Sequence, residues 1–271
     1  MLYQKIYLKD FYELDSDANI EIMVPINRDF EARDKTRAII VVPGGGYSFV
    51  SKREADPVAI EFLRQNFVTI TLEYSTHRAY PYPQFELACA FDYVRRHADE
   101  LFVDKDKISA IGFSAGGHLV GSYGYLYQMK EFLNLGFDED MIKPNCLILS
   151  YPVILMNEKA HQETKEIITG NSPYLLDLLS IDKHIDSNYP PTFIWTTVED
   201  DIVPYENSVV MAEKLKEKNI EHEFFLYPYL HHGLSVVNPL NYSSQELENK
   251  YYQEVSLWFS KCVEFIKKVL S

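Results

Sequence analysis

A serine between glycines is the residue of this sequence best suited to covalent chemistry. The segment Gly112-Phe113-Ser114-Ala115-Gly116 has the pattern G-x-S-x-G, of which about one match is expected by chance in ten chains of this length. A strand-like apolar run precedes it and a helix-like run follows it, which is the strand–turn–helix setting of a serine nucleophile. The alternative is a glycine that ends a strand and a serine that caps a helix. The context favours the nucleophile.

A serine nucleophile needs a base and an acid that orients the base, and in this setting they follow the serine in the order acid, histidine. Three carboxylates follow the strand-like run 192–197, namely Glu199, Asp200 and Asp201. Two histidines follow the run 224–227, namely His231 and His232. The residues themselves leave both choices open. A metal site at the two histidines is not supported, because adjacent side chains splay apart and no HxxxH spacing is present.

Backbone N–H groups that stabilise a developing oxyanion are the remaining requirement. The residue after the nucleophile, Ala115, supplies one of them. The second is expected in the loop Gly44-Gly45-Gly46, which follows an early apolar run, because glycines let the backbone approach a substrate. The glycine spacing does not match a dinucleotide-binding motif. A plain glycine turn is the alternative.

The elements that position these residues alternate along the chain. Continuous or alternating apolar runs predict strands at 3–8, 20–24, 38–42, 67–72, 108–112, 146–151, 192–197 and 222–227. Helical spacing of apolar residues predicts helices at 54–66 (with Ile60 and Leu63 on the apolar stripe), 84–98, 115–127, 205–218 and about 245–270. This alternation predicts a mostly parallel, doubly wound α/β sheet. We expect one domain over 1–271, with a cap or lid insert at about 153–190.

Composition narrows the classes of partner. The chain has 271 residues with 26 Lys and Arg against 40 Asp and Glu, a net charge of −14. This charge disfavours nucleic acid and anionic membranes as partners. The N-terminus lacks the pattern of a signal peptide, and no apolar run is long enough to cross a membrane. The three cysteines are widely spaced, so we expect buried thiols in a cytoplasmic protein rather than a disulfide framework.

Five segments together carry a family resemblance: PGGGYSFVSKRE, LEYSTHRAYPYP, IGFSAGGHL, PPTFIWTTVEDDIVPYENS and LHHGLS. In this order they resemble α/β-hydrolase esterases and lipases, and in particular the small carbohydrate esterases of the acetyl-xylan and feruloyl type. The resemblance implies that the acid is Asp200, which stands four residues before the proline of D-x-x-V-P, and that the base is His232, directly before a glycine. It places the oxyanion donors at Gly45 and Gly46, with Ala115 as the third.

The resemblance implies a serine carboxylesterase that needs no metal or other cofactor and hydrolyses short acyl esters, above all acetyl esters of sugars or xylo-oligosaccharides. Aromatic residues near the glycine loop and in the 77–85 loop are candidates for the substrate pocket, namely Tyr47, Tyr80 and Tyr82. Core packing is the competing role for each of them. An arylformamidase or small peptidase with the same triad, and a catalytically silent binding protein, are the alternatives. By analogy with such enzymes, a homodimer is the suggested assembly.

Overall fold

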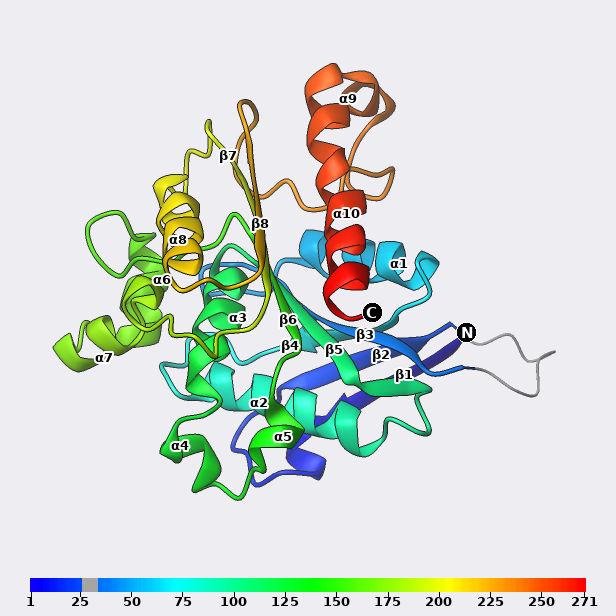
Figure 1. The fold of residues 1–271 in the computed structure, drawn as a ribbon, viewed down its shortest axis with the longest axis vertical. Coiled ribbons are helices and arrows are strands. Elements are labelled where there is room, and N and C mark those ends of the chain that lie inside the picture. The colour runs from blue at the N-terminus through cyan, green and yellow to red at the C-terminus, as the bar shows by residue number, and fades with distance from the viewer. Residues whose placement is uncertain (26–33) are drawn as a thin grey trace.

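The computed structural model describes residues 1–25 and 34–271, and its centre is an eight-stranded sheet (Figure 1). The strand order is β1-β2-β4-β3-β5-β6-β7-β8. The strands are β1 (Leu2–Tyr7), β2 (Asn19–Val24), β3 (Thr36–Val42), β4 (Val68–Glu73), β5 (Val103–Phe113), β6 (Cys146–Ser150), β7 (Thr192–Thr197) and β8 (His222–Tyr227). Only the β1–β2 and β2–β4 pairings are antiparallel among these strands. The predicted mostly parallel α/β sheet is therefore confirmed.

Burial on both faces explains the continuous apolar runs of the inner strands. All residues of β6 and β7 are buried, and so are the last five of β3. Alternate residues of β3 enter different cores: Ile40 and Val42 pack on one side of the sheet, and Ile39 and Val41 pack on the other. A strand covered on both faces needs apolar side chains at every position, so it shows no alternation in the sequence.

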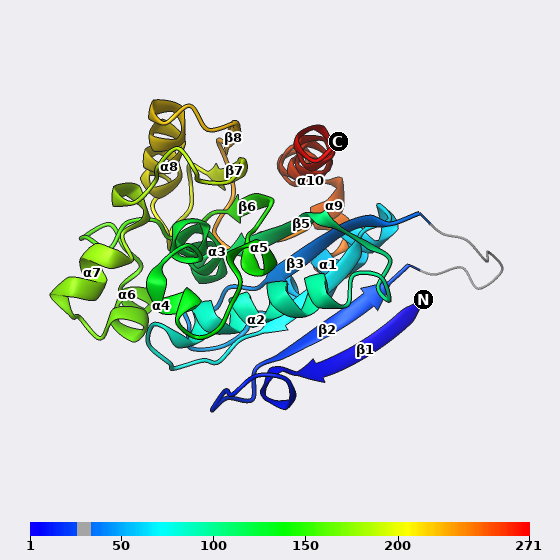
Figure 2. The same cartoon turned by 60° about the horizontal axis from the view of Figure 1, so that its bottom comes forward.

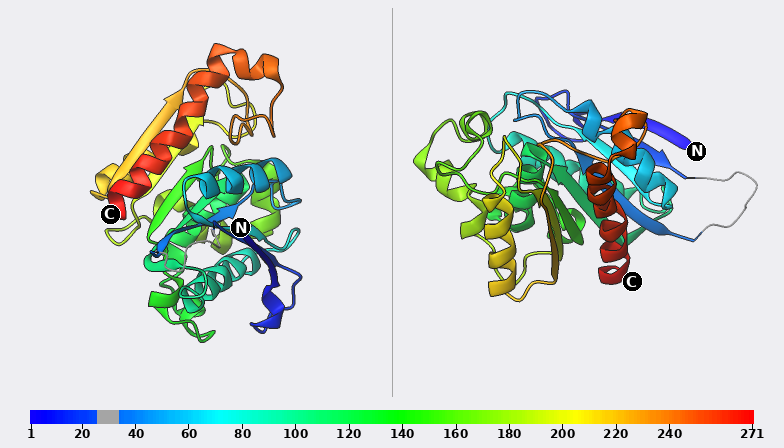
Figure 3. Two further views of the ribbon diagram at one scale, coloured as in Figure 1. Left: turned by 90° about the vertical axis from the view of Figure 1, so that its right-hand side faces the viewer. Right: turned by 90° about the horizontal axis from the view of Figure 1, so that it is seen from above.

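Helices cover the two faces unequally (Figures 2 and 3). The helices α2 (Tyr82–Arg96), α3 (Ala115–Leu126) and α8 (Glu206–Glu217) pack on one face, and α1 (Asp56–Arg64) and α10 (Lys250–Val269) pack on the other. Short helices α4 (Lys130–Leu133) and α5 (Glu139–Ile142) follow α3. Figure 2 shows β1 and β2 at one edge of the sheet and β7 and β8 at the opposite edge. Helices on both faces are the doubly wound arrangement that the sequence predicts.

Two helix predictions are wrong in detail. The single helix expected at about 245–270 is two helices, α9 (Ser244–Glu248) and α10, which meet at Asn249. The Asn249 side chain accepts a hydrogen bond from the N–H of Tyr251 and caps α10, and such a side chain favours a new helix start. On α1, Ile60 is 37% exposed, whereas Phe62 and Val58 form the buried stripe.

The segment after β6 contains α6 (Gln162–Thr169), α7 (Pro173–Leu178) and the short 3-10 helix η3 (Ile181–Lys183). These are the weak helical patches of the predicted insert at 153–190. Polar contacts tie the segment to the body of the protein. The Asn207 side chain accepts hydrogen bonds from the N–H groups of Ile154 and Leu155, each at 3.0 Å. The Tyr125 hydroxyl donates to the carbonyl of Leu178 at 2.7 Å.

The loops that carry Gly44–Gly46, Ser114, Asp200 and His232 all lie at the carboxyl ends of the parallel strands. Because β3, β5, β7 and β8 run parallel, their carboxyl ends point the same way. The loops that follow them carry Gly44–Gly46, Ser114, Asp200 and His232 respectively. Ligand sites of open α/β sheets form at this edge.

Candidate active site

Ser114 lies on a sharp turn between β5 and α3. Its backbone has φ 53° and ψ −116°, which an L-residue adopts only under strain. The strained turn is held at both ends: the Ser114 N–H donates to the Ser150 carbonyl at 3.0 Å, and the Ser114 carbonyl accepts from Val153 at 3.2 Å. The residue Ser114 is 8% exposed. The turn therefore holds the hydroxyl in one place with limited access to water.

The glycines on either side of Ser114 are required by close backbone contacts. A methyl group on Gly112 would lie 2.1 Å from the Gly116 carbonyl oxygen. A methyl group on Gly116 would lie 2.2 Å from the carbonyl oxygen of Val42. Both distances are shorter than any real contact, so the G-x-S-x-G pattern has a steric cause. The absence of side chains at Gly112 and Gly116 lets the first turn of α3 lie directly against β3 and β5.

His232 links Ser114 to a buried carboxylate. Its Nε2 lies 2.8 Å from the Ser114 Oγ, and its Nδ1 lies 2.7 Å from the Asp200 Oδ2. The Asp200 side chain is fully buried, and its other oxygen accepts the N–H groups of Ile202 and Val203. Because a carboxylate only accepts, it fixes the proton on Nδ1 and leaves Nε2 as the acceptor facing the hydroxyl. This arrangement can take the proton of Ser114.

The competing residues that the sequence offers have different partners. The Asp201 carboxylate accepts the backbone N–H of His232 at 3.3 Å, which lowers its pKa. The Glu199 carboxylate accepts the N–H of Leu230 at 3.0 Å. The ring of His231 bonds to the carbonyl of His232 instead of reaching Ser114. Both neighbouring carboxylates thus shape the histidine loop, while only the ring of His232 meets Ser114 within the described residues.

The glycine loop after β3 presents its backbone to the same place. Gly45 has φ 123° and Gly46 has φ 64°, so both residues need the freedom of glycine. The loop is closed by the Gly45 carbonyl, which accepts the N–H groups of Ser48 and Phe49. Within residues 1–25 and 34–271, the N–H groups of Gly45, Gly46 and Ala115 have no hydrogen-bond partner. These predicted donors are therefore available to a ligand.

A buried glutamate, which no sequence motif indicates, supports this loop. Glu54 is 4% exposed; its Oε2 accepts the Gly44 N–H at 2.8 Å, and its Oε1 accepts the hydroxyl of Tyr151 at 2.7 Å. The same hydroxyl accepts the N–H of Ser235 at 2.9 Å. The ring of Tyr151 packs edge-on against His232, with centroids 4.8 Å apart. Glu54 thus joins the glycine loop to the histidine loop through one tyrosine.

The three predicted pocket tyrosines lie in different environments. Tyr47 is fully buried, so it does not line an open pocket; its hydroxyl lies 2.9 Å from Nδ1 of His118. Tyr80 is partly buried, which raises the pKa of its hydroxyl to about 12, and its N–H donates to Ile168 of α6. Tyr82 is also partly buried and stacks under the guanidinium of Arg78. Tyr47 is therefore a core-packing residue, which was the alternative to a place in the substrate pocket.

The insert brings two further side chains to the glycine loop. A methyl group on Gly46 would lie 3.0 Å from Oε2 of Glu163 and 3.5 Å from Cε1 of His161. His161 is also close enough to His232 for the two imidazoles to interact electrostatically. No sequence motif indicates either residue, because the insert has no motif that determines where it folds.

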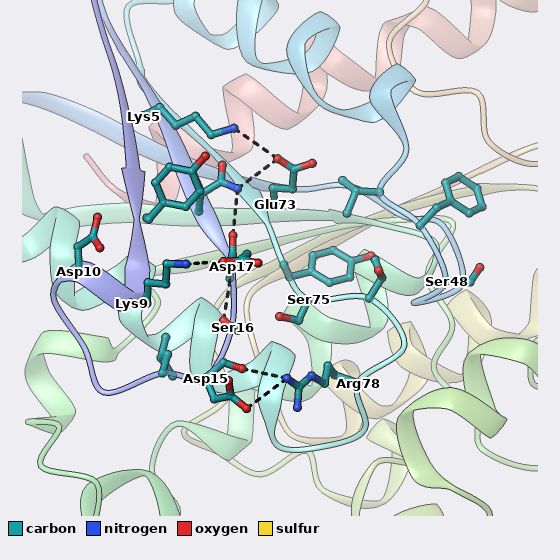
Figure 4. Close-up of a pocket in the computed structure, with 18 residues that line it drawn as sticks. Lys5, Lys9, Asp10, Asp15, Ser16, Asp17, Ser48, Glu73, Ser75 and Arg78 are labelled. Carbon is teal, nitrogen blue, oxygen red and sulfur yellow. Dashed lines mark hydrogen bonds and ion pairs between the residues drawn. The ribbon is translucent and has the colours of Figure 1, made fainter.

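A polar cleft of about 1110 Å³ is bordered by Ser48–Val50, which follow the glycine loop (Figure 4). It is lined by residues from β1, from the connection between β1 and β2, from the end of β4 and the loop that follows it, and from the loop Ser48–Val50. Its lysines and arginine are paired: Lys5 with Glu21, Lys9 with Asp17 and Arg78 with Asp15. The cleft therefore has little unpaired positive charge to offer an anion.

The described residues contain neither a cluster of metal ligands nor a membrane-spanning helix. In that part of the chain, no group of three or more His, Cys, Asp or Glu is arranged to hold a metal ion. No helix described here is long and apolar enough to cross a membrane. Cys89, Cys146 and Cys262 are free and buried, as the sequence predicts.

The sheet topology and the strand-end loops define an α/β-hydrolase fold. Comparison with family models matches residues 24–215 to the family BD-FAE. The match covers more than half of the chain, so the chain belongs to this family. The predicted resemblance to carbohydrate esterases is thereby confirmed.

The curated proteins with similar sequences include a xylanase and an acetylxylan esterase. The chain is 32% identical over 211 residues to endo-1,4-beta-xylanase B of Butyrivibrio fibrisolvens, covering 75% of this chain and 33% of that protein. It is 28% identical over 222 residues to an acetylxylan esterase of Xylanibacter ruminicola, covering 79% and 44%. The chain thus spans only about a third to under a half of these curated relatives.

Solved structures match over the full chain. An acetyl ester-xyloside bifunctional hydrolase from Caldicellulosiruptor lactoaceticus superposes with a TM-score of 0.81 at 27% identity, covering 98% of this chain and 96% of that one. The carboxylesterase Cest-2923 from Lactobacillus plantarum has a TM-score of 0.85 at 23% identity, covering 100% and 99%. At that identity, the second match shows the fold alone.

Proposed function

We propose that this chain is a serine carboxylesterase that removes short acyl groups, above all acetyl, from sugars or xylo-oligosaccharides. The observation that carries the proposal is the hydrogen-bonded chain from Ser114 through His232 to Asp200. The N–H groups of Gly45, Gly46 and Ala115, which have no partner among the residues that the structure describes, lie beside it. The names of the relatives, an acetylxylan esterase and an acetyl ester-xyloside hydrolase, support the acetyl and sugar parts.

In the proposed reaction, His232 removes the proton of Ser114 while Oγ attacks the ester carbonyl. Asp200 holds the imidazole in the required tautomer and stabilises its cation. The carbonyl oxygen becomes negative and is held by the N–H groups of Gly45, Gly46 and Ala115, each contributing about 3 kcal/mol to stabilisation of the transition state. The C–O bond of the ester then breaks, and the imidazolium gives its proton to the departing alcohol. The acyl group remains bound to Ser114.

Water completes the cycle by the same steps. His232 takes a proton from water, which attacks the acyl carbonyl, and the proton returns to Ser114 as the carboxylic acid leaves. The proposed reaction uses no metal or organic cofactor. The cap role of the insert, a cytoplasmic location and a homodimer stay predictions.

The test compares wild type with Ser114→Ala on p-nitrophenyl acetate, followed by an acyl-chain series and acetylated xylo-oligosaccharides with acetate release measured. We expect Ser114→Ala to lower kcat by a factor on the order of 10⁴ or more. Equal turnover in the two proteins would refute the role of Ser114. Cleavage of formamides or peptides, without cleavage of any ester, would favour the arylformamidase or peptidase alternative. A folded wild type with no turnover of any of these substrates would favour a silent binding protein.

A further inference from the structure

The start of α6 lies against the predicted oxyanion loop. Oε2 of Glu163 and Cε1 of His161 both face the α-carbon of Gly46, at 3.0 Å and 3.5 Å from the position that a methyl group there would occupy. Glycine at this position therefore makes room for two polar side chains as well as for the turn. Both residues come from the insert, so the insert contributes directly to the surroundings of the site.

Local hydrogen bonds fix the orientation and the tautomer of His161. The backbone N–H of Thr164 donates to its Nδ1 at 3.4 Å, and the hydroxyl of Thr164 lies 2.9 Å from the same nitrogen. Since a backbone N–H can only donate, Nδ1 is an acceptor and the ring proton is on Nε2. Burial lowers the pKa of His161, as does the neighbouring His232, while Glu163 raises it. The neutral ring thus presents an N–H donor, which has no partner within the described residues.

Glu163 adds an acceptor beside this donor. Its side chain is exposed, and within the described residues it has no hydrogen bond or ion pair. A donor and an acceptor beside the same glycine match the hydroxyl groups of a sugar, because each hydroxyl both donates and accepts. The carboxylate and the net charge of −14 disfavour an anionic group at the same place.

We propose that His161 and Glu163 form a hydroxyl-binding subsite, which recognises the neutral polyhydroxylated part of an ester whose acyl group lies at Ser114. This inference rests on the proposed ester hydrolysis and names the residues that select the substrate. A subsite built to hydrogen-bond hydroxyls discriminates against esters that lack them, because its polar groups then lose their partners. An acetylated sugar satisfies both residues, whereas an aryl acetate satisfies neither.

The test measures the ratio of kcat/KM for an acetylated xylo-oligosaccharide to kcat/KM for p-nitrophenyl acetate. We expect this ratio to fall about tenfold in His161→Asn and in Glu163→Gln, the effect of one lost hydrogen bond to the sugar. Asparagine is chosen because it still caps α6 while its short side chain withdraws the Nε2 donor. Glu166→Gln is the matched control: it removes an exposed carboxylate of the same helix, and the ratio should stay as in wild type.

A second measurement separates failure of this inference from failure of the proposed function. Methyl β-xyloside should inhibit hydrolysis of p-nitrophenyl acetate by wild type, with an inhibition constant that rises about tenfold in His161→Asn. A wild type that does not hydrolyse p-nitrophenyl acetate would overturn the proposed function itself. An active wild type whose ratio and inhibition constant do not change in either variant would overturn the subsite alone. Equal losses of kcat/KM on both substrates would also overturn the subsite, because they would mean that His161 acts in the chemical step or in folding rather than in binding the sugar.

Discussion

Replacing Glu54 by glutamine tests whether the buried carboxylate holds the glycine loop in its working position. The carboxylate accepts from two donors, the Gly44 N–H and the Tyr151 hydroxyl. Glutamine has the same shape but only one oxygen. Whichever way the amide is turned, its NH₂ group faces one of the two donors, and that donor loses its acceptor.

The structure sets the size of the effect. A hydrogen bond to a charged group contributes about 1.5–3 kcal/mol, and a buried donor left without a partner costs about as much. A loss of about 2 kcal/mol in the free energy of unfolding is therefore expected. The activity loss has an upper limit in the complete removal of an oxyanion donor, a factor of about 10²–10³ in kcat. Because Gly45 and Gly46 would be displaced rather than removed, we expect kcat to fall about tenfold to a hundredfold.

The assay is steady-state hydrolysis of p-nitrophenyl acetate, with urea unfolding of the same samples. The lower kcat should come with a nearly unchanged KM, because the oxyanion forms only in the transition state. Glu158→Gln, at an exposed position of the same insert that contains α6, is the control and should match wild type. A folded Glu54→Gln protein with kcat within about twofold of wild type would refute the role assigned to Glu54.

Two other predictions concern the histidines. Asp200→Asn should lower kcat by a factor on the order of 10³–10⁴, because the imidazole of His232 loses the carboxylate that fixes its tautomer. Asp201→Asn should lower kcat by less than about tenfold. Equal losses of kcat in the two variants would mean that the acid is misassigned. His118 is fully buried, which lowers its pKa from 6.5 to about 4. Since the unfolded chain then binds a proton that the folded chain does not, the free energy of unfolding falls as the pH drops from 6.5 towards 4, by about 3 kcal/mol at most. Urea unfolding across this range should show a smaller fall in His118→Gln than in wild type, and parallel curves would refute the buried neutral state.

The fold was largely predictable because burial dictates it residue by residue. The run at 192–197 became β7 with unchanged bounds, since a strand covered on both faces leaves a continuous apolar signal. The run at 222–227 became β8, also with unchanged bounds, although this edge strand is mostly only partly buried. The C-terminal helix was harder, because apolar periodicity continues across Asn249 and only the side-chain cap shows where the second helix begins. Local hydrogen bonding decided that boundary, and it competes with periodicity at every helix end.

The candidate site was predictable only where the chemistry demands a fixed local sequence. The turn at Ser114 requires glycines for steric reasons, so it left a motif. Glu54 has no such local requirement: its partners, Gly44 and Tyr151, are 10 and 97 residues away along the chain. Which buried carboxylate meets which loop depends on how β3 and β6 are placed in the sheet, and that placement is a property of the whole fold.

His118 shows how a residue outside the proposed reaction can still hold its parts together. One ring nitrogen lies 2.9 Å from the Tyr47 hydroxyl, beside the glycine loop, and the other lies 3.0 Å from the Leu179 carbonyl in the insert. His118 itself begins the second turn of the helix that Ser114 opens, and its N–H donates to the Ser114 carbonyl. The turn at Ser114, the glycine loop and the insert therefore meet at one neutral imidazole. The insert that presents His161 and Glu163 is thus fixed to the same helix that Ser114 opens. In the proposed reaction, a substrate bound to these two residues is therefore held in register with Ser114.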